Sequence, residues 1–235
     1  MFSKSIILIP TLREKDNLVN LLPAIFNLMP DISVLVVDDN SRDGTNELID
    51  NLKQKFINLF LLKRENEPGY GKAILSGMKW AIDKEFDYVI TMDSDFSHDF
   101  KSVPDIIKKL EVEDVVLGSR YTRGGKIENW TFSRKLLSRL ANSYVRLVLG
   151  LSFGDVTTGF VGYSRASVKK IIEKEPKSEG YAFLVESKYI LAKAGFKIYE
   201  YPIIFRERRQ GQSKMSYKII WESMWMPWKI KLRKA

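Results

Sequence analysis

Short apolar runs alternate with longer amphipathic stretches along the first half of the chain. Apolar runs bounded by polar residues are typical of buried strands, and apolar residues that recur every three or four positions indicate helices. The predicted strands cover residues 5–9, 33–37, 59–62, 88–92 and 115–117. The predicted helices cover residues 14–29, 45–56, 72–84 and 100–110. This alternation predicts an α/β fold in which helices flank a mainly parallel sheet.

The sequence becomes basic and aromatic after about residue 119. Residues 130–149 combine apolar positions with Arg and Lys, which predicts a helix with an apolar stripe and a cationic flank. Such a helix either faces a membrane or is an ordinary packed surface helix.

A second amphipathic segment occupies residues 217–235. Trp221, Trp225 and Trp228 recur there at helical spacing, and Pro227 is expected to kink or end the helix. Indoles favour the lipid headgroup region, and the Lys and Arg residues that follow are attracted to anionic lipid. We therefore expect a C-terminal helical extension at the membrane interface, with packing on the core or on a partner subunit as the alternative.

The composition excludes several kinds of chemistry. The 235 residues contain no cysteine, which excludes disulfides, thiolate metal sites and a cysteine nucleophile. The single histidine, His98, is interpreted as a residue of a surface loop or of a helix start. A net charge of +9 indicates an anionic partner, either nucleic acid, nucleotide phosphates or an acidic membrane surface. No apolar run reaches transmembrane length, so we expect a soluble or peripheral protein.

An acidic motif, Asp93-Ser94-Asp95, follows the predicted strand at residues 88–92. Side chains two apart on an extended chain share a face, so both carboxylates are able to point at one cation. A divalent ion held there would grip a diphosphate. The alternative is that the acids only terminate the strand, as Asp often does.

A second acidic pair, Asp38-Asp39, ends the predicted strand at residues 33–37. Its carboxylates suit the hydroxyls of a ribose, and the polar residues that follow also suit a turn that caps the next helix. The carboxyl ends of parallel strands meet at one edge, which is the usual ligand crevice of an open α/β sheet. We therefore expect both acidic motifs to lie along that crevice.

Taken with later motifs, these segments resemble the inverting, metal-dependent family-two glycosyltransferases of the GT-A fold, in particular the dolichol-phosphate mannose synthase branch. The resemblance spans nearly the whole chain and rests on residues 9–14, 36–45, 71–73, 92–98, 118–121, 155–160, 180–186, 208 and 211–214. It implies a catalytic domain over residues 1–216, within which residues 130–149 face the acceptor or the membrane. Residues 217–235 would then form a membrane-interface tail.

The resemblance also implies roles for individual residues. The expected nucleoside contacts are Pro10, Glu14, Val37 and Asp39. The expected contacts of the diphosphate and of a Mg²⁺ or Mn²⁺ cofactor are Asp93, Ser94, Asp95 and Ser97. The cations expected to face phosphates are Arg120, Arg208 and Lys214, and the expected lipid-phosphate contacts are Arg134 and Ser138. The expected catalytic residues are Asp93, Asp95 and Arg120.

Three positions depart from the family pattern. Leu12 stands where relatives usually carry tyrosine, which affects the packing around the base or ribose. Ser97 replaces an amide side chain that commonly helps bind the metal, so the third protein ligand stays open. Glu179 stands where many relatives have lysine, and no phosphate role is assigned to it.

The resemblance implies transfer of a hexose, with inversion, from a nucleotide sugar to dolichyl or polyprenyl phosphate at the cytoplasmic face of a membrane. GDP-mannose is the expected donor, and UDP-glucose is the second choice. A phosphate acceptor is already anionic near neutral pH and needs positioning more than deprotonation, whereas a hydroxyl acceptor would need a base such as Asp93.

Three other functions compete with this interpretation. One is a transferase of the same fold that acts on a glycan or a protein hydroxyl, and another is a non-catalytic sugar-nucleotide sensor. The third is a basic nucleic-acid-binding protein, which accounts for the charge. The two acidic motifs of this chain would repel the phosphate backbone of a nucleic acid, so no nucleic-acid partner is expected.

Overall fold

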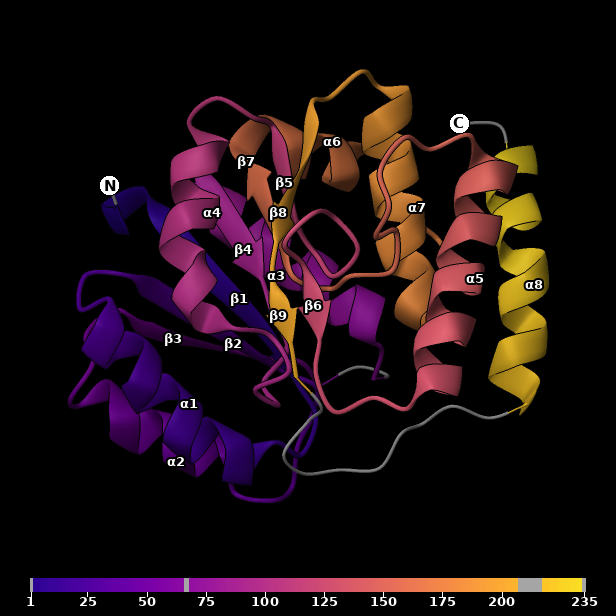
Figure 1. Ribbon diagram of the computed structural model, residues 1–235. Helices are drawn as coiled ribbons and strands as arrows, with labels where there is room; N and C mark the ends of the chain where they lie inside the picture. Colours follow the sequence, from indigo (N-terminus) through magenta and orange to yellow (C-terminus); the bar gives the residue numbers. More distant parts are fainter. Residues whose placement is uncertain (1, 66–67, 207–216, 234–235) are drawn as a thin grey trace.

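The computed structural model describes residues 2–65, 68–206 and 217–233 and consists of one large sheet flanked by helices (Figure 1). The sheet has seven strands in the order β3-β2-β1-β4-β7-β5-β8. These strands are β1 (Ser5–Thr11), β2 (Ser33–Asp38), β3 (Leu59–Lys63), β4 (Tyr88–Thr91), β5 (Val115–Ser119), β7 (Val161–Ser164) and β8 (Ile198–Pro202). Only β7 runs antiparallel to its neighbours β4 and β5, so the predicted mainly parallel α/β sheet is confirmed.

The helices that cover the sheet are α1 (Lys15–Leu28), α2 (Thr45–Lys53), α3 (Tyr70–Asp83), α4 (Val103–Leu110), α5 (Phe132–Leu149), α6 (Arg165–Lys174), α7 (Gly180–Lys193) and α8 (Tyr217–Leu232). Short 3-10 turns precede β1 (Phe2–Lys4) and α4 (Phe100–Ser102). The predicted helix at residues 100–110 therefore starts as a tighter turn, and Pro104 sits in the first turn of α4, where its missing N–H costs nothing. A small parallel ribbon joins β6 (Lys126–Ile127) to β9 (Ile204–Phe205).

The sheet is buried on both faces. Along β1, Ile6 and Leu8 join the core beneath α3, α6 and α7, while Ile7 and Ile9 join the core beneath α1 and α4. All four side chains are completely buried. Parallel strands buried on both faces read as continuous apolar runs, which is why the sequence predicted them well.

Helix α8 continues through Pro227 to Leu232, so the proline does not end the helix. Contacts with α5 hold the helix across this point. The Tyr144 hydroxyl of α5 donates to the Met224 carbonyl at 2.6 Å and accepts from Trp228 Nε1 at 3.0 Å. Lys231 Nζ donates to the Val148 carbonyl at 2.7 Å. These tertiary bonds offset the helical hydrogen bond that a proline removes. No helix in the described part of the chain combines the length and the apolar content needed to cross a membrane.

Candidate functional site

The carboxyl ends of β2, β1 and β4 lie next to one another, as predicted for a ligand crevice. Thr11 at the end of β1 pairs with Asp38 at the end of β2, and the Asp39 amide donates to the Thr11 carbonyl at 2.9 Å. Asp93 follows β4, the other neighbour of β1. The topology thus brings both acidic motifs to one edge of the sheet.

The two acids at the end of β2, Asp38 within the strand and Asp39 directly after it, make different contacts. Asp38 is completely buried, and its Oδ2 accepts from the Ser41 amide at 3.0 Å, which is the turn interpretation. Asp39 is only 4% exposed, and its carboxylate accepts from the Gly69 amide at 2.7 Å and forms an ion pair with Arg64. A ligand that binds Asp39 would therefore meet a carboxylate that already has a cation and an amide in place.

The other expected nucleoside contacts are Glu14, Pro10 and Val37, which lie on or next to β1 and β2. Glu14 is partly exposed just before α1, where its carbonyl accepts from the Leu18 backbone N–H and its Oε2 accepts from the side-chain Nδ2 of Asn17 at 2.7 Å. Pro10 is partly buried in β1. Val37 is completely buried and packs against Gly77 of α3, because a Cβ on Gly77 would come within 2.9 Å of Val37 Cγ2. The Val37 side chain therefore belongs to the core rather than to the crevice surface.

The Asp93-Ser94-Asp95 motif lies in a loop directly after β4, where it leaves the buried sheet. Asp93 and Asp95 are partly exposed, while Ser94 and Ser97 are only 4% and 3% exposed. The Ser97 amide donates to Asp95 Oδ1 at 3.0 Å, which closes a tight turn around Phe96. Because Ser97 is buried, its hydroxyl is poorly accessible to a metal ion.

The donor set of this motif fits a hard divalent cation. Two carboxylates and a set of phosphate oxygens and waters are the usual ligands of Mg²⁺ bound to a nucleotide. Within residues 2–65, 68–206 and 217–233, no cluster of three or more Asp, Glu, His or Cys side chains forms a complete protein metal site. A metal at Asp93 and Asp95 would therefore need further ligands beyond these two carboxylates.

His98 is buried beside Asp93, so its interpretation as a surface residue is wrong, although it does lie just before Asp99, the N-cap of the 3-10 turn Phe100–Ser102. Its ring is 3% exposed and stacks on Phe160, with 5.2 Å between the ring centroids. Its Nδ1 accepts from the Asp93 amide at 3.0 Å. Phe160 directly precedes β7 and is distant in sequence from His98. The sequence around His98 therefore does not predict this packing.

Tyr70 also contacts Asp93 and was not among the predicted site residues. Its hydroxyl donates to Asp93 Oδ1 at 3.1 Å. Burial, followed by the charge of Asp93, raises the pKa of Tyr70 well above its ordinary value, so the phenol remains a donor. In the sequence, Tyr70 stands between Gly69 and Gly71, a pattern that by itself indicates a turn, whereas in the structure α3 already begins at Tyr70.

Arg120 lies just beyond β5 and is bound by a buried acid. Its Nε and one terminal nitrogen donate to the two Asp155 oxygens at 2.7 and 2.6 Å, and the same terminal nitrogen donates to Thr157 at 2.8 Å. Burial acts to lower the pKa of Arg120, but Asp155 outweighs it and raises the pKa above the ordinary value. Its guanidinium is thus oriented by Asp155, a partner that the sequence did not indicate.

The remaining predicted phosphate contacts lie on α5 or outside the described residues. The Arg134 guanidinium stacks over the Trp130 ring at 4.0 Å, and Ser138 Oγ accepts from the Tyr121 hydroxyl at 2.6 Å. Tyr121 follows β5, so α5 is tied to the edge of the sheet at Ser138. The predicted phosphate contacts Arg208 and Lys214 lie outside the described residues.

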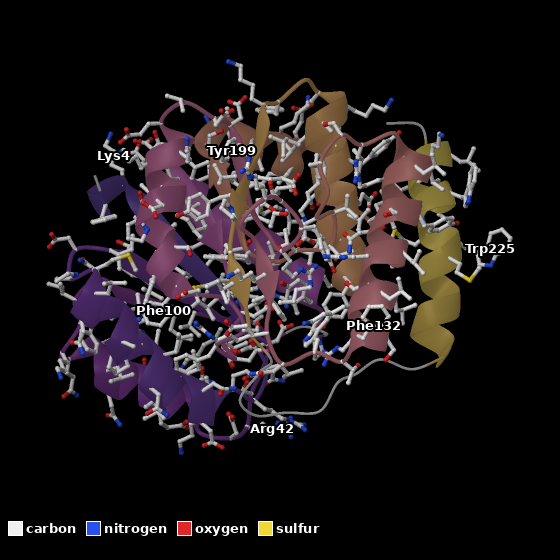
Figure 2. The ribbon with its side chains drawn as sticks, viewed as in Figure 1. Lys4, Arg42, Phe100, Phe132, Tyr199 and Trp225 are labelled. Atoms are coloured by element: carbon white, nitrogen blue, oxygen red, sulfur yellow. The ribbon has the colours of Figure 1, made fainter. Side chains whose placement is uncertain are left out.

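Helices α5 and α8 lie side by side at one end of the molecule and expose apolar side chains (Figure 1). We call this surface the α5/α8 face; its exposed apolar residues are Phe132, Leu136, Leu137, Leu140, Leu147, Met224, Trp225, Trp228 and Leu232. Figure 2 shows Trp225 pointing away from the body of the molecule. The side chain of Trp221 lies outside the described part. Both helices also carry Arg and Lys residues, of which Arg139 on α5 and Lys229 on α8 are exposed.

Comparison with known families and proteins identifies relatives along nearly the whole chain. Residues 6–172 match the model described as Glycosyl transferase family 2. An undecaprenyl-phosphate mannosyltransferase from Micrococcus luteus is 36% identical over 217 residues, which cover 92% of this chain and 89% of the relative. A polyprenol monophosphomannose synthase from Mycolicibacterium smegmatis is 34% identical over 223 residues, which cover 94% and 84%.

Solved structures share the fold at lower sequence identity. A glucosyl-3-phosphoglycerate synthase from Mycobacterium tuberculosis, crystallised with Mn²⁺, UDP-glucose and phosphoglyceric acid, superposes with a TM-score of 0.70 at 18% identity. The match covers 95% of this chain and 79% of that structure. This similarity confirms the predicted GT-A architecture.

Proposed function

The chain belongs to glycosyl transferase family 2, and on that basis we propose that it transfers a mannosyl group from GDP-mannose to a polyprenyl phosphate. The observation that carries this proposal is its similarity to two relatives whose names both specify mannose and a polyprenyl phosphate. Both matches cover more than nine tenths of this chain. The acceptor is thus a lipid phosphate rather than a sugar or protein hydroxyl.

The donor would bind along the crevice formed by β2, β1 and β4. The carboxylates of Asp39 and Glu14 would accept hydrogen bonds from the ribose hydroxyls and the base of the nucleoside, with Asp39 held in place by Arg64 and the Gly69 amide. Asp93 and Asp95 would hold Mg²⁺ or Mn²⁺, which neutralises charge on the departing nucleoside diphosphate. Arg208 and Lys214 would add positive charge at the same phosphates.

The reaction would be one displacement at the anomeric carbon. An oxygen of the acceptor phosphate forms the new bond while the bond to the diphosphate oxygen breaks, and GDP leaves with the electron pair. Because the attacking phosphate is already anionic, the residues around it need to orient it and need not remove a proton. Arg134 and Ser138 on α5 would provide that orientation, with Arg120 near the end of β5.

The α5/α8 face would bind the membrane that holds the acceptor. Its exposed apolar side chains suit the boundary between headgroups and acyl chains, and its Arg and Lys residues suit anionic lipid. Since α5 also carries Ser138 and Arg134, a lipid phosphate at the membrane surface would be close to the crevice. We therefore propose a peripheral enzyme that takes its acceptor from the bilayer.

The decisive experiment combines the purified protein with liposomes that contain polyprenyl phosphate, with Mg²⁺ or Mn²⁺, and with single labelled nucleotide sugars. We expect label from GDP-mannose in the lipid phase and much less from UDP-glucose. Label from UDP-glucose alone would keep the reaction class and change the donor. Label that enters a soluble glycan or a peptide, but not the lipid, would contradict the proposal.

A further inference from the structure

Asp93 is held from two separate elements. Tyr70, the first residue of α3, donates its hydroxyl to Asp93 Oδ1 at 3.1 Å. His98, five residues along the same loop, accepts the Asp93 amide at Nδ1 at 3.0 Å. One contact fixes the carboxylate and the other fixes the backbone that carries it. We propose that Tyr70 and His98 are positioning residues that set the Asp93 carboxylate for a divalent cation, an inference that rests on the proposed function.

The tautomer and orientation of His98 follow from its contacts. Because Nδ1 accepts a backbone N–H, it carries no proton, and the ring proton of the neutral form is on Nε2. That nitrogen lies 3.9 Å from Asp93 Oδ2. The ring stacks on Phe160 and meets the edge of Phe205 at 5.8 Å, so it has little freedom to turn. Because the His98 ring is held in place, its Nδ1 also holds the backbone of Asp93, the first residue of the acidic motif.

Tyr70 is held equally closely. A Cβ on Gly159 would lie 2.9 Å from the Tyr70 hydroxyl, so glycine leaves the space that the phenol occupies. The ring of Tyr181, on α7, has its centroid 6.2 Å from that of the Tyr70 ring. The preceding amide, Gly69, donates to Asp39 at 2.7 Å. The start of α3 therefore joins the acid that follows β2 to the acid that follows β4.

The geometry also divides the two Asp93 oxygens. Oδ1 accepts the hydrogen bond from the Tyr70 hydroxyl, and Oδ2 lies 3.9 Å from His98 Nε2. Hydrogen bonds to metal-binding carboxylates commonly control both their orientation and their affinity. Tyr70 thus acts through Asp93 and does not itself bind the metal.

The first test measures Mn²⁺ affinity by electron paramagnetic resonance, with GDP present, in the wild type and in Tyr70→Phe. We expect the Mn²⁺ dissociation constant to rise about tenfold in Tyr70→Phe, in the range typical of lost outer-shell bonds. Tyr201→Phe is the matched control, because the Tyr201 hydroxyl donates to Asp105 at 2.6 Å outside the crevice. It should bind Mn²⁺ as the wild type does. Equal affinities in Tyr70→Phe and the wild type would overturn the proposal for Tyr70.

The second test separates the acceptor role of His98 from its bulk. In His98→Asn the amide oxygen takes the place of Nδ1, whereas His98→Leu keeps apolar volume and loses the acceptor. We expect Mn²⁺ binding to weaken about tenfold in His98→Leu and to be largely restored in His98→Asn. Equal loss in both variants, at equal folded content by circular dichroism, would overturn the acceptor role. If neither His98 variant folds, the Tyr70→Phe comparison decides the proposal.

The tests of Tyr70 and His98 measure Mn²⁺ binding, whereas the proposed function is tested by sugar transfer. The two proposals can therefore be contradicted independently. A wild type that binds Mn²⁺ but transfers no sugar would contradict the function and leave the positioning roles in place. A wild type that binds no Mn²⁺ with GDP present would overturn the positioning roles. Transfer that continues in the presence of a metal chelator would do the same.

Discussion

Arg120 and Asp155 form a two-point ion pair between the end of β5 and the loop before β7, with N–O distances of 2.7 and 2.6 Å. The Asp155 side chain is completely buried, and the Arg120 side chain is 9% exposed. A pair this deeply buried is costly to break, because removal of one partner leaves the other charge without compensation.

Asp155→Asn should therefore lower the free energy of unfolding by about 3 to 5 kcal/mol. Denaturation in guanidinium chloride measures the change. Glu173→Gln is the control, because Glu173 pairs with Lys170 on the exposed surface of α6 and should lose less than about 1 kcal/mol. A similar small loss in Asp155→Asn would show that the buried pair does not stabilise the fold.

Asp95→Asn should abolish most of the transfer while it preserves the fold. The variant removes one of two carboxylate charges at the proposed metal site but keeps an acceptor for the Ser97 amide. We expect turnover to fall at least about 100-fold and to recover only partly at high Mn²⁺. Assays across Mn²⁺ concentrations measure this, with Asp83→Asn, at an exposed position near the end of α3, as a control that keeps full activity.

Trp225→Ser should weaken binding to anionic liposomes about fivefold, because an exposed indole on the α5/α8 face no longer enters the interface. Co-sedimentation with vesicles measures the change. Ile57→Ser is the control, since Ile57 is exposed between α2 and β3, away from that face. A wild type that stays in the supernatant with anionic vesicles, or equal binding of both variants, would contradict the proposed membrane surface.

Lys188 should make stability rise with pH above neutrality. Its ammonium is completely buried and donates to the carbonyls of Val156, Thr158 and Leu184. Burial lowers the pKa of Lys188 from 10.5 to about 7, against the charge of Asp155. Between these two values the unfolded chain holds more protons than the folded chain, so the free energy of unfolding increases as pH rises. Below about pH 7 both states are protonated and this dependence ends.

Unfolding titrations in urea at several pH values from 7 to 10 measure this effect. The contribution of Lys188 is at most about 1.4 kcal/mol per pH unit. Lys188→Met should flatten the increase, and Lys193→Met, at an exposed position on the same helix, should leave it unchanged. The same slope in Lys188→Met and the wild type would show that Lys188 titrates normally.

The sequence predicted β1 to β5 well because each is a continuous apolar run, and it did not indicate β7 or β8. Strand β7 (Val161–Ser164) contains Gly162 and Ser164, so its pattern is weak. It becomes a strand because it lies antiparallel between β4 and β5. Pairing across the sheet, rather than local preference, decides such a segment.

The amino-acid sequence by itself determined the α/β class, the position of Asp39 and the Asp93-Ser94-Asp95 motif at strand ends, and the family. Local apolar periodicity and ordered motifs carry that information. Only the tertiary structure decided that Asp38 closes a turn, that Arg120 binds Asp155 and that Tyr70 and His98 hold Asp93. Those contacts join residues on different elements, and the free energy that selects them comes from burial and hydrogen bonding that no single segment contains.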